Sequence, residues 1–120
     1  MTETLQPPQA GKILIKTFSS TINPFDRVHY HTIKTEGNTL GRDGCGVIEQ
    51  VGAGVDSALV GQKAIFFKDA WSTYAEKDPN EVIFLDKKTD LSTVSNGYVN
   101  PLTAIALLDT IESYKATAFI

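Results

Sequence analysis

The sequence has few of the residues that hold small secreted domains or metal sites together. Its 120 residues include one cysteine, Cys45, and two histidines, His29 and His31. One thiol forms no disulfide within the chain, which excludes a disulfide-bonded secreted domain and favours a reducing, cytoplasmic location. A structural zinc site needs four nitrogen or sulfur ligands in close pairs, and this chain offers only three candidates. We therefore expect no zinc.

Long apolar runs and an excess of positive charge are also lacking. The longest apolar run, residues 102–108, is interrupted by Thr103 and is far shorter than the roughly 18 residues that cross a bilayer. The N-terminus has no apolar segment typical of a signal peptide. The formal net charge is −3, which gives the chain no electrostatic reason to bind nucleic acid. We expect a soluble globular domain that binds neither membranes nor nucleic acid.

Short segments rich in β-branched and apolar residues predict strands, because glycines and an Asp-Pro turn separate them. The predicted strands are residues 12–18, 44–51, 63–68, 72–76 and 81–85. Several short strands in this spacing are typical of a small barrel or sandwich. Gly44 and Gly46 would lie on one strand face where another backbone passes closely. Gly52 and Gly54 would supply positive φ angles in a turn.

Two Asn-Pro steps predict helix starts. Asparagine caps the free backbone donors there, and proline fits the first helical position because its missing N–H would have no partner. Asn23 therefore begins a short helical turn, and Asn100 begins a longer helix. That helix carries apolar residues at the spacing i, i+3, i+4, i+7, which predicts an apolar stripe. The stripe consists of Ala104, Leu107, Leu108 and Ile111.

The last residues, 115–120, resemble the beginning of a strand that has no downstream partner in the sequence. We expect the chain to be a piece of a larger architecture. We also expect this apolar segment to pair with a second copy of the chain or with a partner chain.

Several features have an ordinary structural explanation. Capping alone accounts for both Asn-Pro steps, although helix starts also present N–H groups that suit an anionic or carbonyl ligand. Cys45 lies within a predicted strand, where a thiol is usually buried and inert. The glycine-rich segments 41–46 and 52–54 lack the G-x-G-x-x-G pattern of phosphate sites. We interpret His29 and His31 as loop or edge residues.

In this order the segments resemble the medium-chain dehydrogenase/reductase superfamily, over about residues 7–116, and specifically its N-terminal GroES-like domain. The most specific stretch, residues 40–55, reads LGRDGCGVIEQVGAGV and is similar to the family pattern G-x-D-x-x-G-V-V-x-x-V-G-x-x-V. Residues 7–16, 22–26, 61–64, 72–76 and 99–104 resemble its P-x-x-G-x-V-L-V-K, I-N-P-x-D, G-D-x-V, G-T-Y-A-E and V-N-P-L-T-A motifs.

The resemblance implies a mainly β fold, a GroES-like, partly open β-barrel with short helices. Residues 1–99 would form this domain. Residues 100–120 would form a linking helix, at the C-terminus, and the first strand of a nucleotide-binding Rossmann domain that this sequence does not contain.

The resemblance also implies a reaction. Zinc alcohol dehydrogenases carry a His-Glu pair where this sequence has Arg42 and Asp43, so the chain looks like the zinc-free quinone oxidoreductase and enoyl reductase branch. Such enzymes transfer hydride from NADPH to a small-molecule substrate, a quinone or an α,β-unsaturated carbonyl. Because the missing Rossmann domain would bind most of the NADPH, we expect this segment alone to be inactive.

Site residues follow from the matching positions. Asn23, Asn100 and Thr103 would lie near the nicotinamide of the cofactor. Arg42 and Asp43 would flank the substrate cleft.

The proton donor is the position at which this sequence departs from its relatives. Related reductases often carry a tyrosine a few residues after N-P-x-D, where this sequence has Val28 or Lys34, depending on the alignment. Tyr30 and His29 are the candidate catalytic residues that stand in for it, with His31 nearby.

Two non-enzymatic interpretations stay open. One is a structural or binding module derived from this domain. The other is a GroES-like oligomeric cap, which rests on the shared fold alone, and fold does not imply function.

Overall fold

The structure, a computed structural model, describes residues 4–32, 39–115 and 117. Within them, five strands form an antiparallel sheet in the order β4-β1-β2-β3-β5. The strands are β1 Ile13–Ser20, β2 Asp43–Val51, β3 Lys63–Phe67, β4 Tyr74–Lys77 and β5 Val82–Leu85. The helices are α1 Pro24–Thr32 and α2 Val99–Ser113, with 3-10 turns η1 Ser57–Leu59, η2 Pro79–Glu81 and η3 Leu91–Thr93. The sheet does not close on itself, which confirms the predicted partly open barrel.

The core lies on the inner face of the curved sheet. Its isoleucine and phenylalanine side chains are fully buried, and alanines fill the space between them. Burying each such large side chain contributes about 1.5–3 kcal/mol. The members are Ile13, Ile15, Ile48, Ala64, Phe66, Ala70 and Ala75.

A second, smaller apolar cluster contains Cys45, Ile65 and Leu91. Ile65 and Phe66 are consecutive on β3, so the two clusters lie on opposite faces of that strand. The Cys45 thiol is fully buried, and its Sγ donates to the Leu91 carbonyl at 3.3 Å. The expectation of a buried cysteine is confirmed.

The glycines of β2 permit close packing, as predicted for Gly46. A Cβ at Gly46 would lie 2.1 Å from the Lys16 carbonyl oxygen on the neighbouring strand. The prediction for the following turn was right for Gly54, whose φ is +83°, and wrong for Gly52. Gly52 is needed for space instead, because a Cβ there would lie 1.9 Å from the Gln9 carbonyl oxygen.

The first Asn-Pro step begins α1 as predicted, but the asparagine side chain does not cap the helix. The Asp26 carboxylate accepts from the Asn23 backbone N–H at 2.8 Å, which is half of a capping box. The helix continues to Thr32, so His29 and His31 are helical. The interpretation of both histidines as loop or edge residues was wrong.

The second Asn-Pro step lies inside α2 rather than at its cap. The helix begins at Val99, and the capping residue, Tyr98, makes no side-chain capping bond. The prediction that Asn100 caps this helix was therefore wrong. Pro101 is tolerated because the first four N–H groups of a helix have no partner within it.

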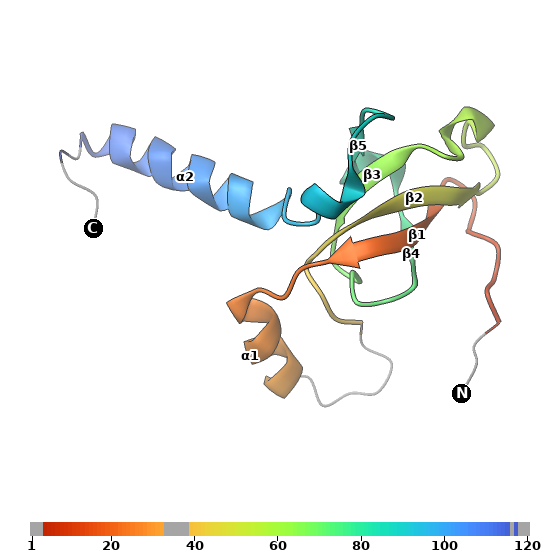
Figure 1. The fold of residues 1–120 in the computed structure, drawn as a ribbon, viewed down its shortest axis with the longest axis horizontal. Coiled ribbons are helices and arrows are strands. Elements are labelled where there is room, and N and C mark those ends of the chain that lie inside the picture. Colours follow the sequence, from red (N-terminus) through yellow and green to blue (C-terminus); the bar gives the residue numbers. More distant parts are fainter. Residues whose placement is uncertain (1–3, 33–38, 116, 118–120) are drawn as a thin grey trace.

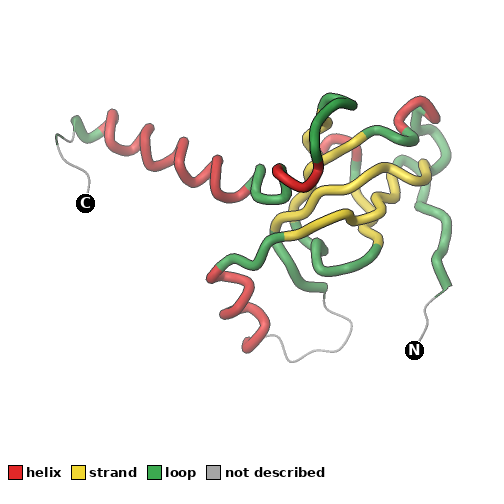
Figure 2. The backbone as a smooth tube through the Cα atoms, in the orientation of Figure 1, coloured by secondary structure: helices red, strands yellow, loops and turns green. Residues whose placement is uncertain are grey.

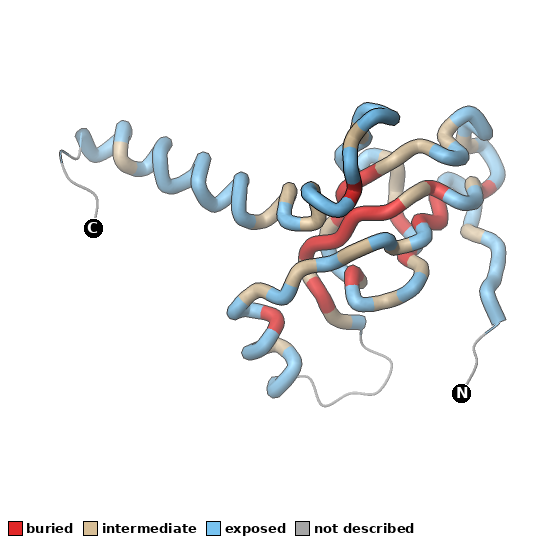
Figure 3. Tube along the Cα trace, in the orientation of Figure 1, coloured by how far each residue is buried: buried red, intermediate tan, exposed pale blue. Residues whose placement is uncertain are grey.

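Helix α2 points away from the sheet, and Figure 2 shows that both helices leave the same end of it. Figure 3 shows α2 as exposed along nearly its whole length. Leu107 and Leu108, two members of the predicted stripe, are 45% and 61% exposed. The predicted stripe is helical, but it does not pack against this sheet.

The strand predicted at residues 115–120 lies largely outside the described residues. Of the part that is described, no helix has the length and apolar character needed to span a bilayer.

Gly46→Ala should destabilise the domain by at least about 3 kcal/mol, since the added methyl group clashes with the Lys16 backbone in the centre of the sheet. Gly61→Ala is the control. It has positive φ but nothing within 4 Å of the added Cβ, and should cost about 1–2 kcal/mol. Urea unfolding measures both, and equal costs would contradict the close approach.

Candidate functional site

A buried carboxylate holds the two helix starts against the sheet. Asp43, the first residue of β2, has no exposed surface. Its Oδ1 accepts from the Val99 backbone N–H at 3.1 Å, and its Oδ2 accepts from the Asn23 side-chain amide at 3.4 Å. Burial raises the pKa of Asp43 above its ordinary value, although these hydrogen bonds and the positive charge of Arg42 act to lower it. Asp43 therefore positions the starts of α1 and α2 relative to the sheet.

The two asparagines predicted to lie at the cofactor meet directly. Asn100 Nδ2 donates to Asn23 Oδ1 at 3.4 Å, across 77 positions of sequence. Asn100 also donates to Asn96. The Thr103 hydroxyl donates to the Val99 carbonyl at 2.8 Å. Because Thr103 follows Asn100 by three residues, it lies about one turn further along the same side of α2.

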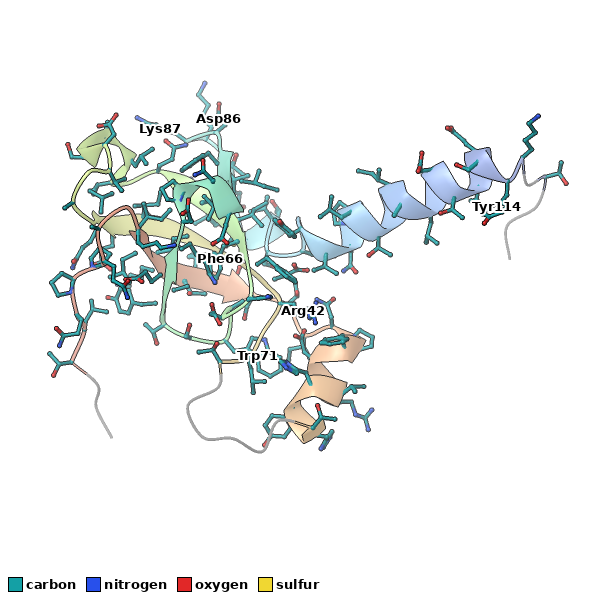
Figure 4. The ribbon with its side chains drawn as sticks, turned by 180° about the vertical axis from the view of Figure 1, so that it is seen from behind. Arg42, Phe66, Trp71, Asp86, Lys87 and Tyr114 are labelled. Carbon is teal, nitrogen blue, oxygen red and sulfur yellow. The ribbon has the colours of Figure 1, made fainter. Side chains whose placement is uncertain are left out.

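Arg42, the residue before Asp43, is stacked among aromatic rings. Its guanidinium is 3.7 Å from the centroid of the Phe25 ring and 5.3 Å from that of Phe67. Phe67 stacks in turn on Tyr98, with centroids 5.4 Å apart and planes at 12°. Figure 4 shows Arg42 at the junction of α1 and the sheet. Unlike Asp43, Arg42 is only half-buried.

The candidate proton donors occupy different faces of α1. The His29 ring lies 5.7 Å from the ring of Phe25, because residues four apart share a helix face. Arg42 stacks on this same Phe25 ring. Tyr30 is 60% exposed and packs on His31 instead. Val28 is also exposed, and Lys34 lies outside the described residues. The structure therefore brings His29, and not Tyr30, toward Arg42.

The aromatic residues Phe25, Phe67 and Tyr98 were missed by the sequence reasoning. Phe25 follows an Asn-Pro step and Tyr98 precedes one, so proximity to these helix starts was the available signal. The position of Phe67 depends on strand pairing, because it lies opposite Asp43 across β2 and β3.

A groove of about 500 Å³ lies between the end of β1 and the turn before β4. Trp71 lines it, and the indole Nε1 donates to the Thr21 carbonyl at 3.1 Å. The adjacent turn is fixed by Asp69, which accepts from the buried Lys77 ammonium at 2.5 Å. Burial acts to raise the pKa of Asp69, but the hydrogen bonds from Lys77 and Thr39 outweigh it and hold the pKa below its ordinary value. The groove is lined by Thr17, Phe18, Ser19, Ser20, Ile22, Ala70, Trp71, Ser72 and Thr73.

The described residues contain no cluster of three or more His, Cys, Asp or Glu side chains able to hold a metal ion.

Comparison with protein families gives a clear match. Residues 9–100 match the family described as the alcohol dehydrogenase GroES-like domain. The chain belongs to this family. The GroES-like domain is the part of the medium-chain dehydrogenase/reductase superfamily that the sequence motifs resemble, so the predicted relationship is confirmed.

Solved structures share the fold of this GroES-like domain. A Mesorhizobium loti protein assigned provisionally as an NADPH:quinone reductase is 28% identical, with a TM-score of 0.75 over 91% of this chain and 35% of that chain. A Bacillus thuringiensis protein with the same provisional assignment is 25% identical, with a TM-score of 0.76 over 87% of this chain and 33% of that chain.

The Escherichia coli quinone oxidoreductase, solved with NADPH, is 19% identical, with a TM-score of 0.74 over 90% of this chain and 35% of that chain. At that identity the likeness is one of fold. The chain thus spans about a third of the length of these proteins. No curated protein matched the sequence.

Asp43→Ala should destabilise the domain by about 2–3 kcal/mol, because it leaves the Val99 N–H and the Asn23 amide without their acceptor. Hydrogen exchange at the Val99 amide should accelerate. Asp43→Asn is the control, since it keeps one oxygen for Val99 and should lose less protection. Unchanged Val99 exchange in Asp43→Ala would contradict the anchoring role.

The raised pKa of Asp43 also predicts a pH dependence. The folded protein binds this proton more tightly than the unfolded chain, whose aspartates titrate near about 3.9. Stability from this group is therefore lost as the pH rises from that value through the raised folded pKa. The unfolding free energy of the wild type minus that of Asp43→Asn should fall over this pH range. A difference that rises would contradict a raised pKa.

Proposed function

We propose that this domain forms the substrate-binding part of an NADPH-dependent oxidoreductase that reduces a quinone or an α,β-unsaturated carbonyl without zinc. The contact between Asn23 and Asn100 carries the proposal, because it unites residues from two distant motifs at one place. The likeness to two proteins assigned provisionally as NADPH:quinone reductases, at 28% and 25% identity, supports it.

The chemistry of the amide pair fits a nicotinamide. The side-chain N–H groups of both asparagines are donated within the chain. Among the described residues no group donates to Asn100 Oδ1, which leaves this oxygen to accept from the N–H groups of the nicotinamide carboxamide. Bound NADPH supplies the hydride. The task of Asn23 and Asn100 is to orient the nicotinamide against the substrate, with Thr103 one turn further along α2.

The zinc-independent part of the proposal rests on the residue types present. Arg42 and Asp43 stand where the zinc alcohol dehydrogenases have His-Glu, and a guanidinium is no metal ligand. The Cys45 thiol is buried and hydrogen-bonded to Leu91. Both oxygens of Asp43 accept hydrogen bonds, from Val99 and Asn23.

For the proton that completes the reduction, we favour His29 over Tyr30. His29 packs on the ring of Phe25, which also contacts Arg42. Tyr30, five residues after Phe25, lies about 140° away from it around the helix at about 100° per residue.

The exposure of α2 indicates that this helix contacts another protein body. This helix has no charged residue before Asp109 and exposes large apolar side chains on several faces, a pattern typical of a helix surrounded by protein. We propose that it contacts a nucleotide-binding body, in the same polypeptide or on another chain. The residues following α2, or a second copy of this chain, are alternative means of covering it.

NADPH titration, followed through the fluorescence of Trp71, tests the function on the 120-residue chain and on its sequence extended beyond Ile120. We expect binding in the extended protein. Asn23→Ala and Asn100→Ala should each weaken it about three- to tenfold, the effect of one lost hydrogen bond.

Asn80→Ala is the matched control, since Asn80 is exposed on η2 and its side chain bonds only to Asp78 among the described residues. It should leave NADPH affinity unchanged. If an extended protein with a folded nucleotide-binding body failed to bind NADPH, the proposed function would be wrong.

A further inference from the structure

The guanidinium of Arg42 is fixed in orientation but has no acceptor. It lies 3.7 Å above the Phe25 centroid and 5.3 Å from that of Phe67, and such stacking uses the face of the group rather than its N–H edge. Among the described residues, the Arg42 side chain makes neither a hydrogen bond nor an ion pair. Its donors therefore remain available, on a half-buried group whose movement is already restricted.

The nearby acids do not neutralise Arg42 by direct contact. Asp43 uses its two oxygens for Val99 and Asn23, and Asp26 Oδ2 accepts from the Asn23 backbone. Both carboxylates are fully buried beneath the helix starts. A second cation, Lys68, lies 5.7 Å from the centroid of the Phe67 ring. The accessible charge at this junction is therefore positive.

Resting on the proposed function, we infer that Arg42 is a substrate-binding residue which donates to the carbonyl oxygen of a conjugated substrate and stabilises the negative charge that develops there. A planar guanidinium can donate two parallel N–H groups to such an oxygen and its neighbours. The aromatic rings around it suit a flat substrate, and the amide pair of Asn23 and Asn100 lies at the same junction.

The charge arises from the reaction itself. A hydride from the reduced nicotinamide, carrying two electrons, forms a C–H bond at the β-carbon. The C=C π pair then moves to form a new double bond to the carbonyl carbon, and the C=O π pair comes to rest on oxygen. That oxyanion later takes a proton from water or from His29. Donors aimed at an atom that becomes charged lower the barrier more than they strengthen binding of the neutral substrate.

The test uses the 120-residue chain and two isosteric probes. Benzoate carries delocalised negative charge on oxygens beside a planar ring, and benzamide has the same shape without charge. We expect about fivefold tighter binding of benzoate, measured from NMR shifts that include the Arg42 Nε–H signal. Arg42→Met should abolish this preference, because it removes the charge and keeps an apolar stem.

Lys68→Gln is the matched control, since it removes the other cation on the Phe67 ring and should leave the preference intact. The proposal fails if wild type binds both probes equally, if Arg42→Met keeps the preference, or if Lys68→Gln removes it. Should Arg42→Met not fold, the wild-type Arg42 Nε–H signal decides: it must shift at lower concentrations of benzoate than of benzamide. Neither probe involves NADPH, so a failure here is separate from a failure of NADPH binding.

Discussion

The arrangement of the site depends on one buried carboxylate. Asp43 has lost its hydration, and this cost is offset by the hydrogen bonds from the Val99 N–H and the Asn23 amide. Those two donors belong to segments separated by more than half of the chain, at the starts of α2 and α1. Because both helix starts are held by one side chain on the sheet, the contact between Asn23 and Asn100 follows from the position of Asp43.

Arg42, the residue before Asp43, is half-buried and does not anchor either helix. Asp43 lies beneath the helix starts, whereas Arg42, in the bend before β2, lies over the rings of Phe25 and Phe67. One dipeptide thus supplies a structural anchor and a half-buried cation at the same place. Phe67 belongs to both arrangements, because it pairs with Asp43 in the sheet and stacks on Tyr98.

Local patterns in the sequence were sufficient to predict the strands and the two helix starts. The roles of individual side chains depended on distant contacts that no local pattern contains. Asn23 was predicted to cap α1, but Asp26 forms the cap and leaves the Asn23 amide for Asp43. Gly52 was assigned a positive φ, although the approach of Gln9 is what requires it. The helical state of His29 was missed because α1 consists largely of weak helix formers.

The first turn of helix α2 contacts the rest of the domain, whereas its later turns have no comparable contacts. Its first turn is held by Asp43 through Val99 and by the stacking of Tyr98 on Phe67, so Asn100 has a fixed position within this chain. The turns beyond it expose apolar side chains and have no such anchor, and an isolated helix of this length is marginally stable in water. Arg42, Asn23 and Asn100 are therefore positioned by the domain itself. Thr103 lies beyond these contacts, in the next turn, so the domain by itself constrains its position less.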